Sequence, residues 1–371
     1  MTHQTPPQNL AFFSLFLFTF FPPSLSLTTV PQSKIKGLFV FGSSLVDNGN
    51  NNFLTNSIAK VDYLPYGIDF PRGPSGRFTN GKNVIDILSE KLGLPNYIPP
   101  FNDPLTKGSK IIHGVNYASG GSGILDNTGS LAGNVISLNQ QIRNFEKVTL
   151  PELELQLRKK SMEILPEYLF VVGSGGNDYS FNYFVGLANG NITIQDFTAN
   201  LTTTLSNQLK GLYNLGARKF VLMAINPNGC SPMATGRVPN QRGCVESLNR
   251  AALMFNDQLK NLVDALRPEM PGSNLVFVNS YKVIRDIITF PSLKGFRDST
   301  NACCEVTNIS EGGTGILCKR GGSICTNRRD FVFFDGLHPT EAVNVIIANK
   351  ALLSNLQAEV YPYNVRHLSQ I

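Results

Sequence analysis

The stretch GLFVFGSSLVDNGNN, residues 37–51, joins a short apolar run to a turn rich in Gly, Ser and Asn. The apolar part, residues 37–41, has the length and unbroken hydrophobicity of a strand buried on both faces. Comparable runs occur at residues 168–172, 219–224 and 274–278, and residues 111–117 are a weaker candidate. Apolar residues recur at helical spacing at residues 84–92, 135–148, 194–215, 247–266 and 341–356. This alternation predicts an α/β fold in which helices cover both faces of a parallel sheet.

The first residues predict a secretory leader. Residues 10–21 read LAFFSLFLFTFF. This run is too short to span a bilayer, since a membrane helix needs about 20 residues, but it suits the apolar region of a signal peptide. No later stretch is long and apolar enough for a membrane span. We therefore expect a leader at residues 1–27, a single domain at residues 28–371 and a secreted protein without a membrane span.

The cysteines and sequons agree with a secretory route. Six cysteines, at positions 230, 244, 303, 304, 318 and 325, predict disulfides in a secreted chain. Cys230 and Cys244 are a plausible local pair, and the pairing of the other four stays open. Asn191, Asn200 and Asn308 each begin an Asn-X-Ser/Thr sequon. No CxxC or HExxH spacing occurs, so we expect no metal.

Composition and charge limit the classes of protein to which the chain can belong. The chain has 371 residues, of which 16% are charged, with 33 Gly and 22 Pro, which is typical of a compact, loop-rich globular protein. It carries 32 Lys and Arg against 26 Asp and Glu, a net charge of +6. Basic pairs at 319–320 and 328–329 are too isolated for a nucleic-acid surface. We expect no nucleic-acid partner.

Polar turns follow the apolar runs where a ligand site is expected. Ligands of open parallel sheets bind outside the carboxyl ends of the strands. Ser44 follows the first run, and GSGGND, residues 173–178, follows the second. Within it, Asn177 is either a neutral donor for a developing oxyanion or a simple turn residue. NYASGGSG, residues 116–123, either lets backbone N–H groups approach a substrate or is only a flexible loop.

A candidate acid and base lie together near the C-terminus. In DGLHPT, residues 335–340, Asp335 and His338 are three residues apart, so the carboxylate can orient the imidazole that a serine nucleophile needs. The chain has only four histidines. His3 lies in the leader, His367 in the tail and His113 in a candidate strand. His338 is therefore the best candidate for a general base.

Together these blocks resemble the plant-type GDSL esterase/lipase family of the SGNH hydrolase superfamily, from about residue 33 to about residue 361. Supporting stretches are LPYGIDF (64–70), PSGRFTNG (74–81), ACC (302–304) and HPTEA (338–342). The resemblance implies Ser44 as nucleophile with Asp335 and His338, and an oxyanion hole formed by Ser44, Gly121 and Asn177. It also implies a three-layer α/β/α sandwich with a flavodoxin-like parallel sheet of about five strands, and no cofactor. The expected location is extracellular, in the cell wall or apoplast.

The first block departs from the family's Gly-Asp-Ser-Leu, because Ser43 stands where the family has Asp. The nucleophile is retained, but loss of the carboxylate is expected to weaken the turn and reduce activity, and Ser43 is a rival nucleophile. Gly120 and Gly123 remain alternatives to Gly121. No GxSxG occurs, so the nucleophile-elbow fold has no motif here.

The resulting hypothesis is two-step acyl transfer from a small-molecule or polymer ester, namely an acyl lipid, a cuticle ester or an acylated wall glycan. Two other hypotheses remain at this point. One is an acyltransferase that uses the same residues to build polyester. The other is a catalytically weak wall or defence protein that uses the fold as a binding surface.

Overall fold

The computed structural model describes residues 1–5, 33–186, 192–237, 243–307 and 313–371. The chain divides into Met1–Pro31 and Gln32–Ile371, and the second unit contains all the helices and strands given below. The predicted leader, residues 1–27, lies outside the described residues except for 1–5. Asn191 and Asn308 also lie outside them, whereas Asn200 is exposed on a helix. Among the described residues, no helix combines the length and the apolar character needed to cross a membrane.

The second unit is built on a five-stranded sheet. Its strands, in spatial order, are β1 (Gly37–Gly42), β2 (Tyr168–Gly173), β3 (Lys219–Met223), β4 (Asn274–Val278) and β7 (Val360–Tyr361). The first four pair in parallel, which confirms the four strong strand predictions, and β7 pairs antiparallel with β4. A separate parallel pair, β5 (Asp298–Ala302) and β6 (Phe331–Phe333), forms a second sheet.

Residues 111–117 are not a strand, contrary to the weaker prediction. Val40 nevertheless donates to Val115 O, and Tyr117 N donates to Val40 O, so this segment runs along the free edge of β1. With it included, the chain passes to one side of β1 and then returns to β2 on the other side. This is the flavodoxin-like order 2-1-3-4-5, whose switch point lies at the carboxyl end of the first strand.

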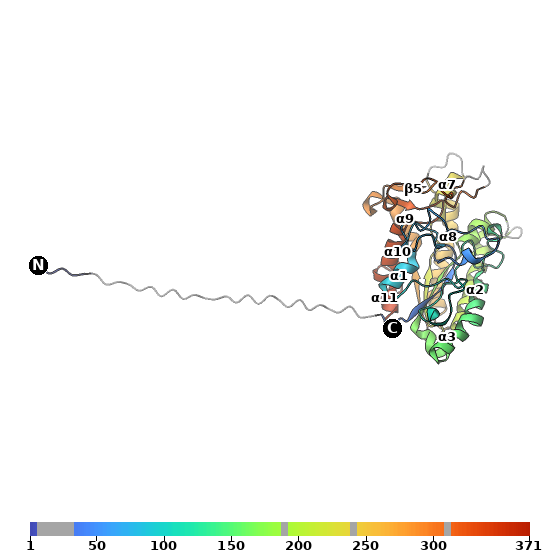
Figure 1. Cartoon of the computed structure of the whole chain (residues 1–371), viewed down its shortest axis with the longest axis horizontal. Coiled ribbons are helices and arrows are strands. Elements are labelled where there is room, and N and C mark those ends of the chain that lie inside the picture. The colour runs from blue at the N-terminus through green and yellow to red at the C-terminus, as the bar shows by residue number, and fades with distance from the viewer. Residues whose placement is uncertain (6–32, 187–191, 238–242, 308–312) are drawn as a thin grey trace. The chain divides into compact units, whose positions relative to one another are not determined.

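Helices cover both faces of the sheet, as Figure 1 shows with α1, α10 and α11 on one side and α2 and α3 on the other. Their bounds are α1 (Val84–Lys91), α2 (Leu138–Asn144), α3 (Leu150–Leu157), α4 (Ser161–Ile164), α5 (Gly176–Asp178), α6 (Ile194–Asn214), α7 (Pro232–Gly236), α8 (Glu246–Ala265), α9 (Ser280–Thr289), α10 (Glu341–Leu353) and α11 (Val365–Leu368). The predicted α/β/α layering is therefore confirmed.

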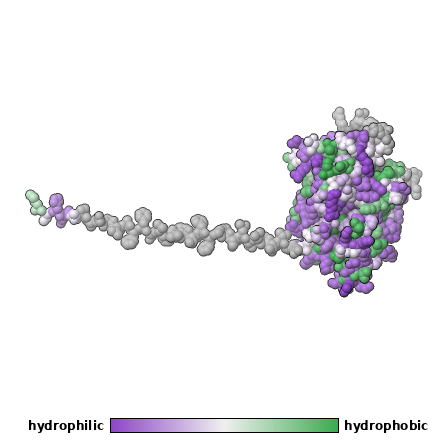
Figure 2. Space-filling model, viewed as in Figure 1, coloured by the Kyte–Doolittle hydropathy of each residue, from purple (hydrophilic) through white to green (hydrophobic). Residues whose placement is uncertain are grey.

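Alternation along β1 explains the two hydrophobic cores. Phe39 and Phe41 pack into the core beneath α2, α3, α6 and α8, while Leu38 and Val40 pack beneath α1, α9, α10 and α11. Every residue of β1 is buried, which is why its sequence is apolar throughout instead of alternating. On the face drawn in Figure 2, apolar residues occur as patches among hydrophilic ones.

Three disulfides link Cys230 to Cys244, Cys303 to Cys325 and Cys304 to Cys318. The first confirms the predicted local pair. The other two cross-link the segment between α9 and β6, where regular secondary structure is sparse. The sequence left the pairing of these four cysteines open, because adjacent cysteines at 303 and 304 can exchange partners without changing the loop lengths much.

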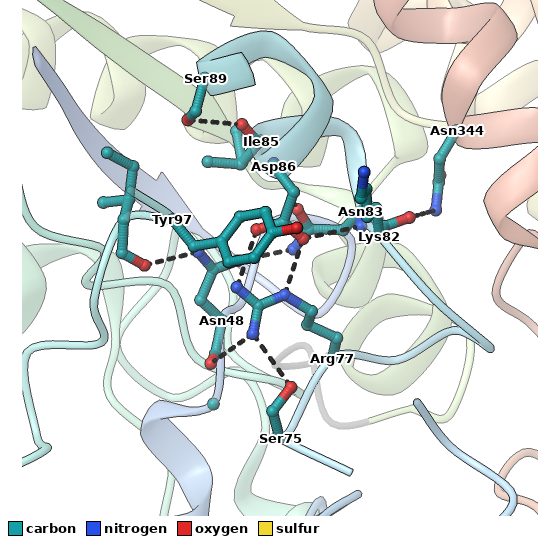
Figure 3. Close-up of polar contacts among 12 residues, drawn as sticks. Asn48, Ser75, Arg77, Lys82, Asn83, Ile85, Asp86, Ser89, Tyr97 and Asn344 are labelled. Carbon is teal, nitrogen blue, oxygen red and sulfur yellow. Dashed lines mark hydrogen bonds and ion pairs between the residues drawn. The ribbon is translucent and has the colours of Figure 1, made fainter. Parts of the chain in front are cut away.

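A buried ion pair ties α1 to the segment that follows β1 (Figure 3). Arg77 Nε and Nη2 lie 2.7 and 2.8 Å from the two carboxylate oxygens of Asp86. Their side chains are 6% and 0% exposed, so the charges can be compensated only by each other and by nearby polar atoms. Asp86 also forms a capping box with Asn83, whose amide donates to Asn48 Oδ1. The start of α1 is thereby fixed to the turn after β1.

Replacing Arg77 by Met should lower the free energy of unfolding by about 3–5 kcal/mol, because it leaves the Asp86 carboxylate buried and unpaired. Adding Asp86→Asn should restore much of that loss, since the amide keeps an acceptor for the cap without carrying a charge. Urea denaturation under non-reducing conditions measures both. A loss below about 1 kcal/mol in the single variant would contradict the structural role given to the pair.

Candidate active site

The first strand ends in a turn that only glycine permits. Gly42 has a φ of +146°, and a Cβ there would lie 2.2 Å from Gly173 O on β2. The buried side chain of Gln141 binds the backbone of β1 at this point, donating to Gly42 O and accepting from Gly42 N at 2.9 and 2.8 Å. The strand therefore ends with a fixed direction, and Ser43 and Ser44 follow at the switch point.

Ser44, His338 and Asp335 form a continuous hydrogen-bonded chain. Ser44 Oγ lies 2.8 Å from His338 Nε2, and His338 Nδ1 lies 2.9 and 3.0 Å from the two oxygens of Asp335. An ionised carboxylate only accepts hydrogen bonds, so Nδ1 carries the proton and Nε2 is left to accept from the Ser44 hydroxyl. Their exposed fractions are 8%, 3% and 0%, so these contacts are shielded from water.

The Asp335 carboxylate is held by its own turn and by a tyrosine. Oδ1 accepts from the backbone N–H groups of Leu337 and His338 at 2.8 and 2.7 Å. Oδ2 accepts from Tyr66 Oη at 2.6 Å, and the same hydroxyl accepts from Cys318 N at 3.0 Å. Burial and the neighbouring Asp335 raise the pKa of Tyr66 well above its usual value, so the phenol remains a donor. The disulfide-bonded loop thus reaches the carboxylate through Tyr66.

Two buried carboxylates hold the Gly-rich loop at residues 118–125. Asp47 accepts from Gly120 N at 2.9 Å and from Gly49 and Asn50 in its own turn. Asp178 accepts from Ile124 N and Leu125 N at 2.9 and 3.0 Å. Burial raises the pKa of each carboxyl from 3.8 to about 6, against the opposing effect of these donors. The loop is therefore fixed at both ends to the turns after β1 and β2.

The predicted oxyanion donors lie around this loop. Asn177 Nδ2 donates to Ser122 O at 2.8 Å, which leaves one amide hydrogen for another acceptor. Gly120 N–H is committed to Asp47, and a Cβ on Gly123 would lie 2.5 Å from the Asp178 carboxylate. Within the described part of the chain, the N–H groups of Ser44 and Gly121 have no hydrogen-bond partner. Of the three candidate glycines, Gly121 therefore fits a donor role best.

A cleft lies between the serine, the histidine and the Asn177 amide. It is lined by Ser44, Asn177 and His338, together with residues from the ends of β2 and β3 and from α10. Apolar side chains form much of the remaining wall, among them Leu45, Met223, Ile225, Leu337 and Ile347. The Phe78 ring packs against the His338 imidazole, with ring centroids 4.9 Å apart. The cleft thus offers an apolar wall beside a serine, a histidine and an amide donor.

The structure brings together the predicted Ser44, Asn177, Asp335 and His338, but sequence reasoning missed the residues that support them. Tyr66 lies in the stretch LPYGIDF, and nothing in that stretch pairs it with a residue 269 positions later. Gln141 looks like an ordinary helix residue. Asp47 and Asp178 offered the one usable signal, since each follows a candidate site residue within three positions.

The raised pKa of Asp178 gives folding a pH dependence. The pKa of the Asp178 carboxyl is 3.8 when it is exposed, as in the unfolded chain, and about 6 in the folded chain. Between these pH values the folded chain holds a proton that the unfolded chain releases. Its stabilising contribution is complete below the reference pKa and is lost as the pH rises through about 6. Two pKa units correspond to about 3 kcal/mol. When the pH is lowered from 7 to 4, the free energy of unfolding of the wild type should therefore rise by up to about 3 kcal/mol relative to that of Asp178→Asn.

Urea denaturation at both pH values measures this difference, with Asp257→Asn as the control because that carboxylate is exposed on α8. If the difference in free energy of unfolding between wild type and Asp178→Asn were the same at pH 4 and pH 7, the Asp178 carboxyl would not titrate between these pH values in the folded protein.

Comparisons with known proteins show which family the chain belongs to. The family model described as GDSL-like Lipase/Acylhydrolase matches residues 38–351. GDSL esterase/lipase At1g29670 of Arabidopsis thaliana is 40% identical over 92% of this chain and 93% of its own length. GDSL esterase/lipase At5g08460, also of Arabidopsis thaliana, is 41% identical over 98% of this chain and 95% of its own length. A solved structure, protein YXIM of Bacillus subtilis, covers 85% of this chain and 54% of its own, with a TM-score of 0.32 and 14% identity, which is too remote to add to the argument. The chain belongs to the GDSL-like lipase/acylhydrolase family.

Proposed function

We propose that this chain is a secreted serine ester hydrolase that forms an acyl-enzyme on Ser44. The observation that carries the proposal is the contact of Ser44 Oγ with His338 Nε2, completed by His338 Nδ1 with Asp335. A serine that is hydrogen-bonded to an oriented imidazole is the arrangement required to activate a hydroxyl group. Membership of a family whose curated relatives are named esterase/lipase supports the same reaction.

In this mechanism, His338 Nε2 takes the Ser44 proton while Oγ attacks the ester carbonyl, and a C–O bond forms as the carbonyl electrons move to oxygen. Asp335 stabilises the imidazolium. The N–H groups of Ser44 and Gly121 and the free amide hydrogen of Asn177 would hold the oxyanion. The oxyanion then collapses, the C–O bond to the leaving alcohol breaks, and His338 gives that alcohol its proton. Water next attacks the acyl carbon while His338 takes its proton, the bond to Ser44 Oγ breaks, and His338 reprotonates the serine.

Ser43 is the rival nucleophile, and the geometry favours Ser44. Ser43 is bound through its backbone to Gly173 O, but within the described chain its hydroxyl has no hydrogen-bond partner. The imidazole therefore has Ser44 as its serine partner. Ser43 occupies the position of the family's Asp, and it leaves the triad itself intact.

A secretory route is supported by the apolar leader sequence, by the three disulfides and by the exposed sequon at Asn200. The proposed location is extracellular, in the cell wall or apoplast. The proposed substrates are carboxylic esters of acyl lipids, cuticle or wall polymers.

The first test is hydrolysis of p-nitrophenyl esters from acetate to palmitate by wild type and by Ser44→Ala. The variant should lose kcat by a factor on the order of 10⁶, the size of the loss in a known serine triad, and fall below detection. Its melting temperature should stay close to that of the wild type, because only one hydroxyl is removed. A pure Ser44→Ala protein that still hydrolyses these esters would disprove the assignment.

A serine-directed phosphonate probe separates the remaining possibilities. Covalent labelling of wild type but not of Ser44→Ala, combined with acyl transfer to added glycerol in place of hydrolysis, would indicate an acyltransferase. A folded wild type that neither labels nor hydrolyses would indicate a binding protein and overturn the proposal.

Tyr66→Phe should lower kcat by about 10-fold, or about 1.4 kcal/mol, because the Asp335 carboxylate loses the donor that fixes its orientation toward the imidazole. The variant should also move the acid limb of the pH–rate profile to higher pH. The reason is that a carboxylate with one donor fewer is a stronger partner for the protonated His338 imidazole. A merely structural tyrosine would not move that limb.

Tyr63→Phe is the matched control for this experiment. Tyr63 packs edge-on against Tyr66 and donates to Cys318 O at 2.8 Å, but it does not contact the carboxylate. Equal pH profiles for the Tyr66 variant, the Tyr63 variant and wild type would rule out positioning of Asp335 by Tyr66.

A further inference from the structure

The cleft contains polar groups that the proposed mechanism does not use. Ser174 directly follows β2, and Asn226 lies three residues after the end of β3. Both residues line the same cleft as Ser44 and His338. Because β2 and β3 are neighbouring parallel strands, the two residues follow strand ends that lie side by side at the same edge of the sheet.

These two side chains are buried and unpartnered. Ser174 is 9% exposed and Asn226 is 8% exposed. Ser174 Oγ and Asn226 Oδ1 have no hydrogen-bond partner among the residues that the structure describes. Buried polar atoms in folded proteins are nearly always hydrogen-bonded, so two unpartnered ones on residues that line the same cleft as Ser44 suggest a ligand contact.

Ser43 determines the space beside them. It also lines the cleft, and its hydroxyl makes no hydrogen bond within the described ranges. A carboxylate at this position, as in the family's Gly-Asp-Ser-Leu, would reach one bond further, add two heavy atoms and carry a charge. The shorter Ser43 therefore leaves room for a neutral polar group next to the nucleophile.

We propose that Ser174 and Asn226, with the room left by Ser43, form a subsite that binds a hydroxyl group of the substrate close to the scissile ester. The chemistry of the two partners selects this group. Asn226 Oδ1 can only accept, so its partner must be a donor, whereas the Ser174 hydroxyl can donate to the lone pairs of that same partner. A hydroxyl group supplies one donor and two acceptor sites at once. The inference rests on the proposed ester hydrolysis and narrows its substrate class to hydroxylated esters.

The hydroxyl group belongs either to the acyl part or to the alcohol part of the ester, and two pairs of substrates distinguish these sources. Ethyl 3-hydroxybutanoate against ethyl butanoate tests the acyl part. Glycerol 1-butanoate against propyl butanoate tests the alcohol part. Acid release by wild type, followed by pH-stat titration, gives kcat/KM for all four esters and hence two selectivity ratios.

Wild type should prefer the hydroxylated ester in one of the two pairs by about 10- to 100-fold, because an ester lacking the hydroxyl leaves two buried polar groups unpaired. Ser174→Ala and Asn226→Leu should each move that ratio toward one. Ser43→Asp should do the same, because the carboxylate fills the subsite. If one variant fails to fold, the other two still decide.

Ser57→Ala is the matched control. Ser57 is also buried with an unpartnered hydroxyl, but it does not line the cleft, so its variant should keep the wild-type ratio. Ratios near one in both pairs for wild type, or a preference that survives both Ser174→Ala and Asn226→Leu, would overturn the subsite alone. No hydrolysis of any of the four esters, and no phosphonate labelling, would instead overturn the proposed function and the subsite with it.

Discussion

The carboxylate of Asp47 is the contact on which the geometry of the cleft depends. It joins the turn after β1, through Gly49 and Asn50, to the Gly-rich loop, through Gly120. Asp47 and Gly120 are 73 residues apart in the chain, and neither contacted segment is a strand or an α-helix at the point of contact. A carboxylate that accepts several N–H groups is buried at some cost, since burial raises its pKa to about 6. In return, the hydrogen bonds of Asp47 hold the serine turn and the Gly-rich loop in fixed positions relative to each other, which strand pairing alone does not do.

Strand order explains why so many functional groups meet at one place. The chain leaves β1, runs along its outer edge through residues 111–117 and returns to β2 on the other side. Ser44, Asn177, Ser174 and Asn226 all follow strands at the same end of the sheet. Asp335 and His338 follow β6, outside the main sheet, and the helix α10 then carries the chain back over the face. The two halves of the candidate triad therefore belong to different structural layers.

Local pattern was enough to predict the four parallel strands and most of the helices, because buried strands leave a direct mark on composition. The roles expected of Ser44, Asn177, Asp335 and His338 came instead from the resemblance of several sequence blocks, taken together, to a known family. Local pattern failed where a residue's role depends on a distant partner. Residues 111–117 have an apolar pattern but only part of a strand's hydrogen bonds, since they flank β1 without forming a regular ladder. Tyr66 and Gln141 act on residues that are 269 and 99 positions away. Such pairings are set by tertiary packing, and one sequence does not display them.

The contact between Ser44 and His338 joins residues 294 positions apart. During synthesis the serine emerges first, and its histidine partner is added only after nearly the whole domain has been made. At roughly 5–20 residues per second, translation alone separates them by about 15–60 s. Through that interval the nascent polypeptide displays the serine turn without a base to deprotonate it. Because the base is encoded so late in the chain, the proposed nucleophile stays unactivated until the C-terminal helices have been made and have packed against the sheet.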